Sequence, residues 1–262
     1  LLYLTSLTIF SQGKDFTKFV NPLVGTKNMG HTFPGATTPF GKVQLSPETN
    51  LQVMFTDDGK YNPDTYIYCA GYQFSDNTIF GFSHTHLSGT GHSDLGDFLI
   101  MPTTGTLNLE SGDAKQPKSG YHSQFSHKNE EASVGYYRVL LDDYNIKAEL
   151  TATDRVGLHQ YTFPKSDEAH IILDLVANIY LHEDKNTWTF IRVENDSLIT
   201  GYKQTNGWAR TKFVYFAMQF SKPFKSYGHK KYDHTKYNGF YRKFDEEHNF
   251  PEMAGKNIKA YF

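Results

Sequence analysis

Short runs of strand-forming residues, separated by Gly, Pro, Asn and Asp, recur along the chain and restrict its fold more than any other feature. Residues 146–150 (IKAEL) alternate apolar and charged side chains, a period-two pattern typical of a strand with one buried face. The run before it, 135–142, is close enough to pair with it as a hairpin, and 154–163 adds a third strand. Little in the sequence favours helix, so we expect an all-β chain that folds as an antiparallel β-sandwich.

Two longer runs are apolar at both odd and even positions. Residues 169–175 (AHIILDL) and 212–220 (KFVYFAMQF) lack the regular polar alternation of a half-exposed strand. A strand that is covered on both faces has this kind of sequence. We therefore expect both runs to be central strands, with neighbouring strands on either side and packed layers above and below.

The charge and cysteine content exclude several classes of protein. The 262 residues include 26 basic and 28 acidic side chains, well mixed along the chain, for a formal net charge of −2. Without a basic stripe, no nucleic-acid partner is expected. The single cysteine, Cys69, rules out a disulfide within the chain. No segment has the length of a transmembrane helix, so we expect no membrane span.

The N-terminus carries a possible export signal. Residues 1–10, LLYLTSLTIF, form an apolar run that is too short to cross a bilayer. It has the length of the hydrophobic region of a signal peptide, and small and polar residues follow it where cleavage occurs. We interpret 1–13 as part of a signal peptide without its basic start and expect a secreted or periplasmic protein. The alternative is an ordinary first strand, because Leu, Tyr, Thr and Ile also suit strands.

Two segments hold more polar and turn residues than a plain sandwich requires. Residues 30–41 contain two prolines and three glycines, which fix the shape of a loop and can position His31. Residues 81–97 contain three histidines, two aspartates and four glycines. Taken alone, the first segment favours a buried crossover between sheets, and the second is also compatible with polar side chains that satisfy one another.

The histidines of the second segment have a spacing that suits ligand binding. On a strand, His84 and His86 point to the same face. Imidazoles two apart are a metal-ligand pattern to which Asp94 or Asp97 can add a carboxylate, and neutral imidazole also hydrogen-bonds sugar hydroxyls. Spacing alone leaves three interpretations open: structural packing, a polar ligand site and a metal site.

The same two segments carry a resemblance to a known family. The strings HTFPGATTPFGKVQLSP and AGYQFSDNTIFGFSHTHLSGTGHSDLGDFLIMPTTG resemble the N-terminal domain of the α-mannosidases of glycoside hydrolase family 92. Weaker matches follow in the same order along the chain, so the resemblance covers roughly 15–262. These weaker matches are FSHKNE with Ala132, GYY, IKAELTAT, NGWA, and FVYFA through KPF.

The resemblance implies an activity for the parent protein and a limited role for this chain. Family members are calcium-dependent, exo-acting α-mannosidases that invert anomeric configuration, with an N-terminal β-sandwich and a C-terminal (α/α)6 barrel. The acid, the base and the calcium ligands belong to the barrel. We therefore expect 14–262 to be the N-terminal sandwich domain, C-terminally incomplete and without a catalytic residue. Calcium prefers oxygen ligands, so we expect no metal site on this chain.

The implied partners are mannose-containing glycans, with α-1,2 linkages expected, and the (α/α)6 barrel of the same polypeptide. The two dense segments are expected at the junction with the barrel, where they help to shape the mannose pocket. His86 is the first candidate for a sugar contact. The full set of candidate substrate-binding or interface residues is His31, His84, His86, His92, Asp94 and Asp97.

Two alternatives remain at this stage. One is a non-catalytic carbohydrate-binding β-sandwich with an aromatic surface and no barrel. The other is a metallohydrolase built on His84, His86 and Asp94.

Overall fold

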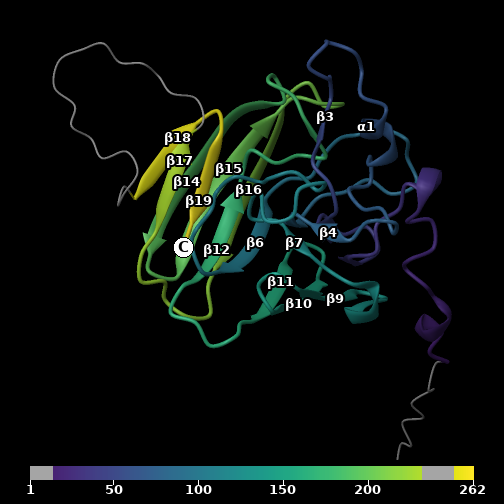
Figure 1. Ribbon diagram of the computed structural model, residues 1–262, viewed down its shortest axis with the longest axis horizontal. Coiled ribbons are helices and arrows are strands. Elements are labelled where there is room, and N and C mark those ends of the chain that lie inside the picture. The colour runs from purple at the N-terminus through teal and green to yellow at the C-terminus, as the bar shows by residue number, and fades with distance from the viewer. Residues whose placement is uncertain (1–13, 232–250) are drawn as a thin grey trace, which may run out of the picture.

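The computed structural model describes residues 14–231 and 251–262, and almost all of their regular structure is β (Figure 1). Residues 1–13, the predicted signal segment, lie outside the described residues. Within the described ranges, no helix has the length and apolar character needed to cross a bilayer. The helical elements are single turns: η1 (Thr17–Phe19), η2 (Asn28–Gly30), α1 (Asp64–Ile67) and η3 (His127–Asn129).

A seven-stranded antiparallel sheet forms the middle of the molecule. Strands from the N-terminal and C-terminal parts of the chain belong to this one sheet, so the fold depends on pairing between residues that are far apart in the sequence. In spatial order the strands are β1 (Ala36–Thr37), β2 (Gln44–Glu48), β5 (Gly81–Ser83), β6 (Leu99–Thr104), β12 (Ala169–Asp174), β19 (Ile258–Tyr261) and β17 (Gly228–Lys231).

A four-stranded sheet contains the hairpin that the sequence predicts. Residue 146 pairs with 141 and residue 151 with 136, as expected for a tight antiparallel hairpin. The third predicted strand pairs on the other side of the same central strand. The order is β11 (Gly157–Thr162), β10 (Ile146–Ala152), β9 (Tyr136–Leu141) and β8 (Glu130–Ser133).

A second four-stranded antiparallel sheet is built around two long strands joined by a short turn (Figure 1). Its order is β16 (Lys212–Gln219), β15 (Leu198–Thr205), β14 (Asn186–Asn195) and β18 (Glu252–Gly255). Two short pairs complete the described structure. These are the parallel pair β3 (Gln52–Val53) with β13 (Tyr180–Leu181), and the antiparallel pair β4 (Thr78–Ile79) with β7 (Ser123–Gln124).

The apolar core is divided between the two faces of the seven-stranded sheet. Leu99 and Met101 of β6 belong to one buried cluster, together with side chains of β9 and β10. Ile100 of the same strand belongs to a second cluster, together with side chains of β14, β15 and β18. Successive strand residues point to opposite faces, so the two clusters lie on opposite sides of β6. The fold is therefore a β-sandwich of three layers, with a four-stranded sheet on each face of the central one.

The prediction for 169–175 is confirmed, because β12 sends Ile172 into one cluster and Leu173 into the other. The prediction of a central strand at 212–220 is wrong. β16 is the edge strand of its sheet, and its side chains alternate between half-buried and exposed. The large apolar residues on its outer face are aromatic: Tyr215 is 71% exposed, stacks on Phe213 of the same strand at 6.3 Å between ring centroids, and contacts Tyr202 of β15 at 5.5 Å. Aromatic cross-strand contacts on a wet face produced the same sequence pattern as burial.

Candidate functional site

The segment 84–97 connects β5 to β6 and lies over the end of the β15–β16 hairpin. The side chains of Asp94 and Asp97 fix it there, since both accept hydrogen bonds from residues 208–212. The first part of the segment packs into the interior, and the last part reaches the surface. The six predicted residues therefore fall into different environments.

His84 and His86 do not share a strand face as a metal-binding pair, because β5 ends at Ser83. The Nδ1 of His84 lies 2.9 Å from the carbonyl oxygen of Phe98, so this nitrogen carries the hydrogen and donates it. Its Nε2 lies 3.0 Å from the Nε2 of His159 on β11, which donates to it. Both rings are neutral in this arrangement. Burial lowers the pKa of His84 to about 4 and also holds the pKa of His159 well below its ordinary value.

His86 is buried with both ring nitrogens engaged. Nδ1 lies 2.7 Å from the carbonyl oxygen of Gln44, and Nε2 lies 2.9 Å from Oε1 of Glu48. The hydroxyl of Ser83 donates to the same carboxylate oxygen at 2.5 Å. The two ring nitrogens therefore each face an acceptor oxygen. His86 thus links β2 to the segment after β5 and has no ring nitrogen to spare.

His31 has hydrogen-bonding capacity left over. It follows η2 in a left-handed conformation, with φ at 54°, and its carbonyl oxygen accepts the N–H of Gly89 at 2.6 Å. Its ring meets the ring of Tyr66 edge-on at 4.8 Å. The side chain is 6% exposed, and its buried Nε2 has no partner in the described part of the chain. Burial also lowers the pKa of His31.

Asp97 is a buried anion surrounded by lysines. Its Oδ2 accepts hydrogen bonds from Lys212 Nζ and from the hydroxyl of Thr85, both at 2.7 Å. Burial alone would raise the pKa of Asp97, but the charges of Lys212 and Lys203 hold it below the ordinary value. Lys203 is itself fully buried and donates to the carbonyl oxygen of Ala177. Burial lowers the pKa of Lys203 to about 7.

Asp94 organises the turn between β15 and β16. Its Oδ1 accepts hydrogen bonds from Lys185 Nζ and, at 2.8 Å, from the backbone N–H of Leu95, while Oδ2 accepts the N–H of Trp208 at 3.0 Å. A side chain at position 207 would clash with Oδ2, which explains the glycine there. Burial would raise the pKa of Asp94, but the bond from Lys185 keeps it below the ordinary value. The carboxylate therefore shapes the loop that presents Trp208.

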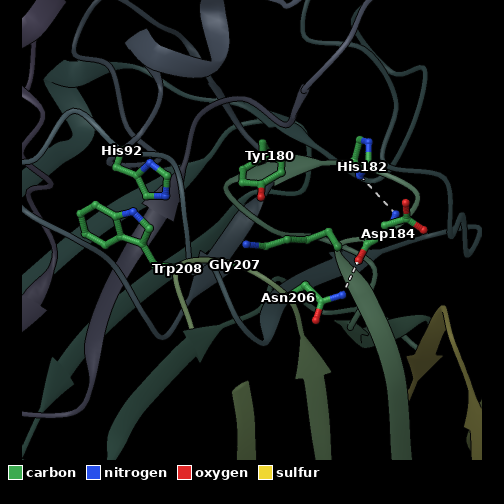
Figure 2. Close-up of a pocket in the computed structure, with 8 residues that line it drawn as sticks. His92, Tyr180, His182, Asp184, Asn206, Gly207 and Trp208 are labelled. Carbon is green, nitrogen blue, oxygen red and sulfur yellow. Dashed lines mark hydrogen bonds between the residues drawn. The ribbon is translucent and has the colours of Figure 1, made fainter. Parts of the chain in front are cut away.

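An open cleft of about 340 Å³ lies at this end of the sheet (Figure 2). His92 and Trp208 stand on one side with their rings stacked 4.2 Å apart, and His182 and Asp184 stand on the other. The residues that line the cleft come from the predicted segment, from β13 and its following turn, and from the β15–β16 turn. They are His92, Tyr180, His182, Asp184, Lys185, Asn206, Gly207 and Trp208.

The donor sets of the described residues do not fit a calcium or zinc site. Across 14–231 and 251–262, no three His, Cys, Asp or Glu side chains are grouped so that they could hold an ion. Asp94 and Asp97 each pair with a lysine, and a cation would have to displace that charge. His84, His86 and Asp94, the residues of the metallohydrolase alternative, each bond to different partners. The geometry gives that alternative no support.

The sequence alone did not identify several residues that shape these sites. Glu48 directly follows the HTFPGATTPFGKVQLSP string, and Trp208 lies in the NGWA string. Neither was predicted as a site residue. A signal for Trp208 exists in the sequence, since a tryptophan between Gly and Ala in a polar turn has no strand to bury it. No comparable signal marks His159 or Lys203, whose roles depend on contacts between distant segments.

Comparisons with known proteins agree with the fold. The family model of the glycosyl hydrolase family 92 N-terminal domain matches residues 19–262. The chain is 39% identical to a solved family GH92 α-mannosidase from Bacteroides thetaiotaomicron, also solved with mannoimidazole. For the mannoimidazole complex the TM-score is 0.80, over 95% of this chain and 30% of that one. A solved GH92 family glycosyl hydrolase, ccman5, is 23% identical with a TM-score of 0.68, over 94% of this chain and 30% of that one.

A curated relative from Arthroderma benhamiae, described as an uncharacterized secreted glycosidase, is 29% identical over 157 residues. That match covers 58% of this chain and 18% of the relative. The chain thus spans less than a third of the length of these proteins. Because the family model covers nearly all of it, the chain belongs to the glycosyl hydrolase family 92 N-terminal domain family.

Proposed function

We propose that this chain is the substrate-pocket and scaffold domain of a secreted, exo-acting α-mannosidase that hydrolyses α-1,2-linked mannosides of glycans with inversion. The observation that carries the proposal is the 39% identity to a solved α-mannosidase over 95% of the chain. A curated relative described as a secreted glycosidase supports the location.

The catalytic groups are proposed to lie in the remainder of such an enzyme. An inverting glycosidase needs one carboxyl group to protonate the leaving oxygen and another to activate water, roughly 6.5–9.5 Å apart. In this chain the buried carboxylates of Glu48, Asp94 and Asp97 already bind His86, Lys185 and Lys212. They are committed to the fold. That the acid and base belong to a C-terminal (α/α)6 barrel is what the family resemblance implies. Calcium, bound there, would act as a Lewis acid and template for the sugar.

The two loops at 31–35 and 84–97 are proposed to face that barrel. The support comes from His31, whose buried Nε2 lacks a partner in the described residues although it lies beside Tyr66. A buried polar group without a hydrogen bond costs about 1–3 kcal/mol. A partner from the barrel, the sugar or ordered water would remove that cost.

The proposal is tested by expressing two proteins: this chain alone, and the same chain continued by its downstream coding sequence. The longer protein is expected to hydrolyse an aryl α-mannoside and α-1,2-mannobiose, to release β-mannose first as judged by NMR, and to lose activity with a calcium chelator. The 262-residue chain is expected to be inactive. Turnover by the short chain, or none by a folded longer protein, would overturn the proposal.

Secretion is tested separately by mass spectrometry of the protein exported by its native host. Cleavage near Gln12 to Lys14 is expected, because the apolar run ends there. An exported protein that retains 1–10 would contradict the signal-peptide interpretation.

A further inference from the structure

The cleft of Figure 2, called the Trp208 cleft below, exposes an aromatic ring that is not packed in the core. Trp208 is 67% exposed, although an indole ring is among the largest apolar groups that a chain can bury. One face of the ring is stacked on His92, with 12° between the ring planes. Since most of the side chain is still exposed, its remaining face and edge are open to a ligand.

One lysine lines the cleft, and its charge is paired. The ammonium of Lys185 is neutralised by Asp94 and lies 4.5 Å from the centre of the Tyr180 ring. His182 Nδ1 accepts the backbone N–H of Asp184 at 3.2 Å, which leaves its Nε2 as a donor. This arrangement gives neither a strongly basic pocket for an anion nor a group of carboxylates for a metal ion.

Acceptors with unused capacity stand on the opposite side of the cleft (Figure 2). The amide nitrogen of Asn206 donates to the carbonyl oxygen of Asp184 at 3.2 Å, which orients the amide. In the described part of the chain, neither the oxygen of that amide nor the carboxylate of Asp184 receives a hydrogen bond from a protein group. The cleft thus combines a donor, two acceptors and an aromatic face within one concave surface.

The loop that carries Trp208 is held in place before any ligand arrives. Asp94 accepts the N–H of Trp208, and the N–H of Asn206 donates to the carbonyl oxygen of Lys185 at 2.9 Å. The glycine at 207 lets the loop approach Asp94 closely. A loop that is ordered in advance loses less entropy on binding, which is typical of a recognition site rather than of an idle surface turn.

We infer that this cleft binds one pyranose ring of a glycan, with Trp208 as the stacking platform and the Asp184–Asn206 side as the hydroxyl-binding side. A pyranose has an apolar C–H face and a rim of hydroxyl groups, so it matches an aromatic ring opposite a donor and two acceptors. The cleft volume of about 340 Å³ lies within the range of small-ligand sites. The choice of mannose as the sugar rests on the proposed function, and the binding of a pyranose rests on the cleft itself.

The chain provides its own matched control, because it contains two tryptophans, Trp188 and Trp208. Trp188 lies on the outer face of β14 and is 42% exposed. In the 15N-labelled chain each gives one indole N–H signal, and W188F assigns them. Titration with methyl α-mannopyranoside is expected to shift the Trp208 signal saturably, with half-saturation in the millimolar range, while the Trp188 signal stays in place. Glycerol, which has hydroxyls but no ring, is expected to give no saturable shift.

Two variants test the assignment of the platform and of the polar side. In the variant Trp208→Ala, binding followed by saturation-transfer NMR of the sugar is expected to fall at least tenfold, and in Asp184→Ala several-fold. Both proteins are expected to keep the parent circular dichroism spectrum, because the two side chains are exposed. No saturable shift of Trp208, equal shifts of both tryptophans, or unchanged binding in Trp208→Ala would overturn the inference. Each result is independent of hydrolysis by the longer protein, so this inference and the proposed function can fail separately.

Discussion

Two polar regions of the molecule both include residues of the segment 84–97, but they differ in how far their side chains are accessible to a ligand. In the polar interior, made up of Glu48, His84, His86 and Asp97, the ring nitrogens and one oxygen of each carboxylate are bonded within the chain, while the buried oxygens Glu48 Oε2 and Asp97 Oδ1 have no partner among the described residues. In the Trp208 cleft, the ring of Trp208 is exposed, and acceptors remain open on the opposite side.

The difference separates a structural role from a binding role more sharply than residue type does. His86 and His92 are six positions apart, yet the first is 4% exposed and fully bonded while the second forms part of the cleft wall. A side chain whose hydrogen bonds are complete contributes to stability, and a side chain with spare capacity on a concave surface is available to a ligand. We therefore expect mutations in the two regions to affect different measurements.

The largest effect is expected for Asp97→Ala. Removing this carboxylate leaves the charge of Lys212 without its paired anion and takes a compensating negative charge away from the fully buried Lys203. Breaking a buried ion pair in this way costs about 3–5 kcal/mol, which would lower Tm by about 6–20 °C in a domain of this size. Thermal unfolding followed by circular dichroism measures the shift, with Asp184→Ala as the exposed control. Equal Tm values for the two variants would remove the contrast between the regions.

The next largest effect is expected from acid, through the contact between His84 and His159. The folded pKa of His84 is about 4 because of burial, whereas the unfolded chain has an ordinary value near 6.5. The unfolded state therefore binds more protons between these two values, so stability is complete above pH 6.5 and falls as the pH drops toward 4. The loss is on the order of 3 kcal/mol. Denaturant unfolding at pH 7 and pH 4.5 measures it, and His84→Gln is expected to reduce the pH dependence. An unchanged dependence in that variant would place the proton uptake elsewhere.

Much of this architecture can be predicted from local sequence, because strand periodicity is a local property. The hairpin at 136–152 and the doubly buried β12 follow from the alternation of apolar residues. The position of β16 could not be predicted, since Phe213 and Tyr215 are as apolar as core residues and only the tertiary structure shows that they face water. The same limit applies to the site. The concentration of polar residues identified 84–97 as a candidate site. Its partners Glu48, His159 and Lys212 are distant in the sequence, so their contacts could be found only from the folded structure.

The smallest effect on stability is expected for Trp208→Ala and Asp184→Asn in the cleft. Both side chains are exposed, and Asp184 receives no hydrogen bond at its carboxylate from the described residues. Surface substitutions of this kind usually change the free energy of unfolding by no more than about 0.5 kcal/mol. Denaturant midpoints of the two variants should match that of the parent chain. A large loss of stability in Trp208→Ala would mean that the stack on His92 stabilises the folded chain. The cleft and the polar interior would then not differ in their contribution to stability.

The most direct test measures binding and stability side by side in His86→Ala and Trp208→Ala. His86→Ala is expected to lower Tm by several degrees, because it removes two buried hydrogen bonds and leaves the buried Glu48 carboxylate with Ser83 alone as its partner. At a temperature where it is folded, it should still bind methyl α-mannopyranoside like the parent. Trp208→Ala should show the reverse, with an unchanged Tm and at least a tenfold loss of binding. If His86→Ala instead loses binding while its Tm is unchanged, the buried histidine is the sugar contact. The polar interior would then have a binding role, which contradicts the structural role given to it.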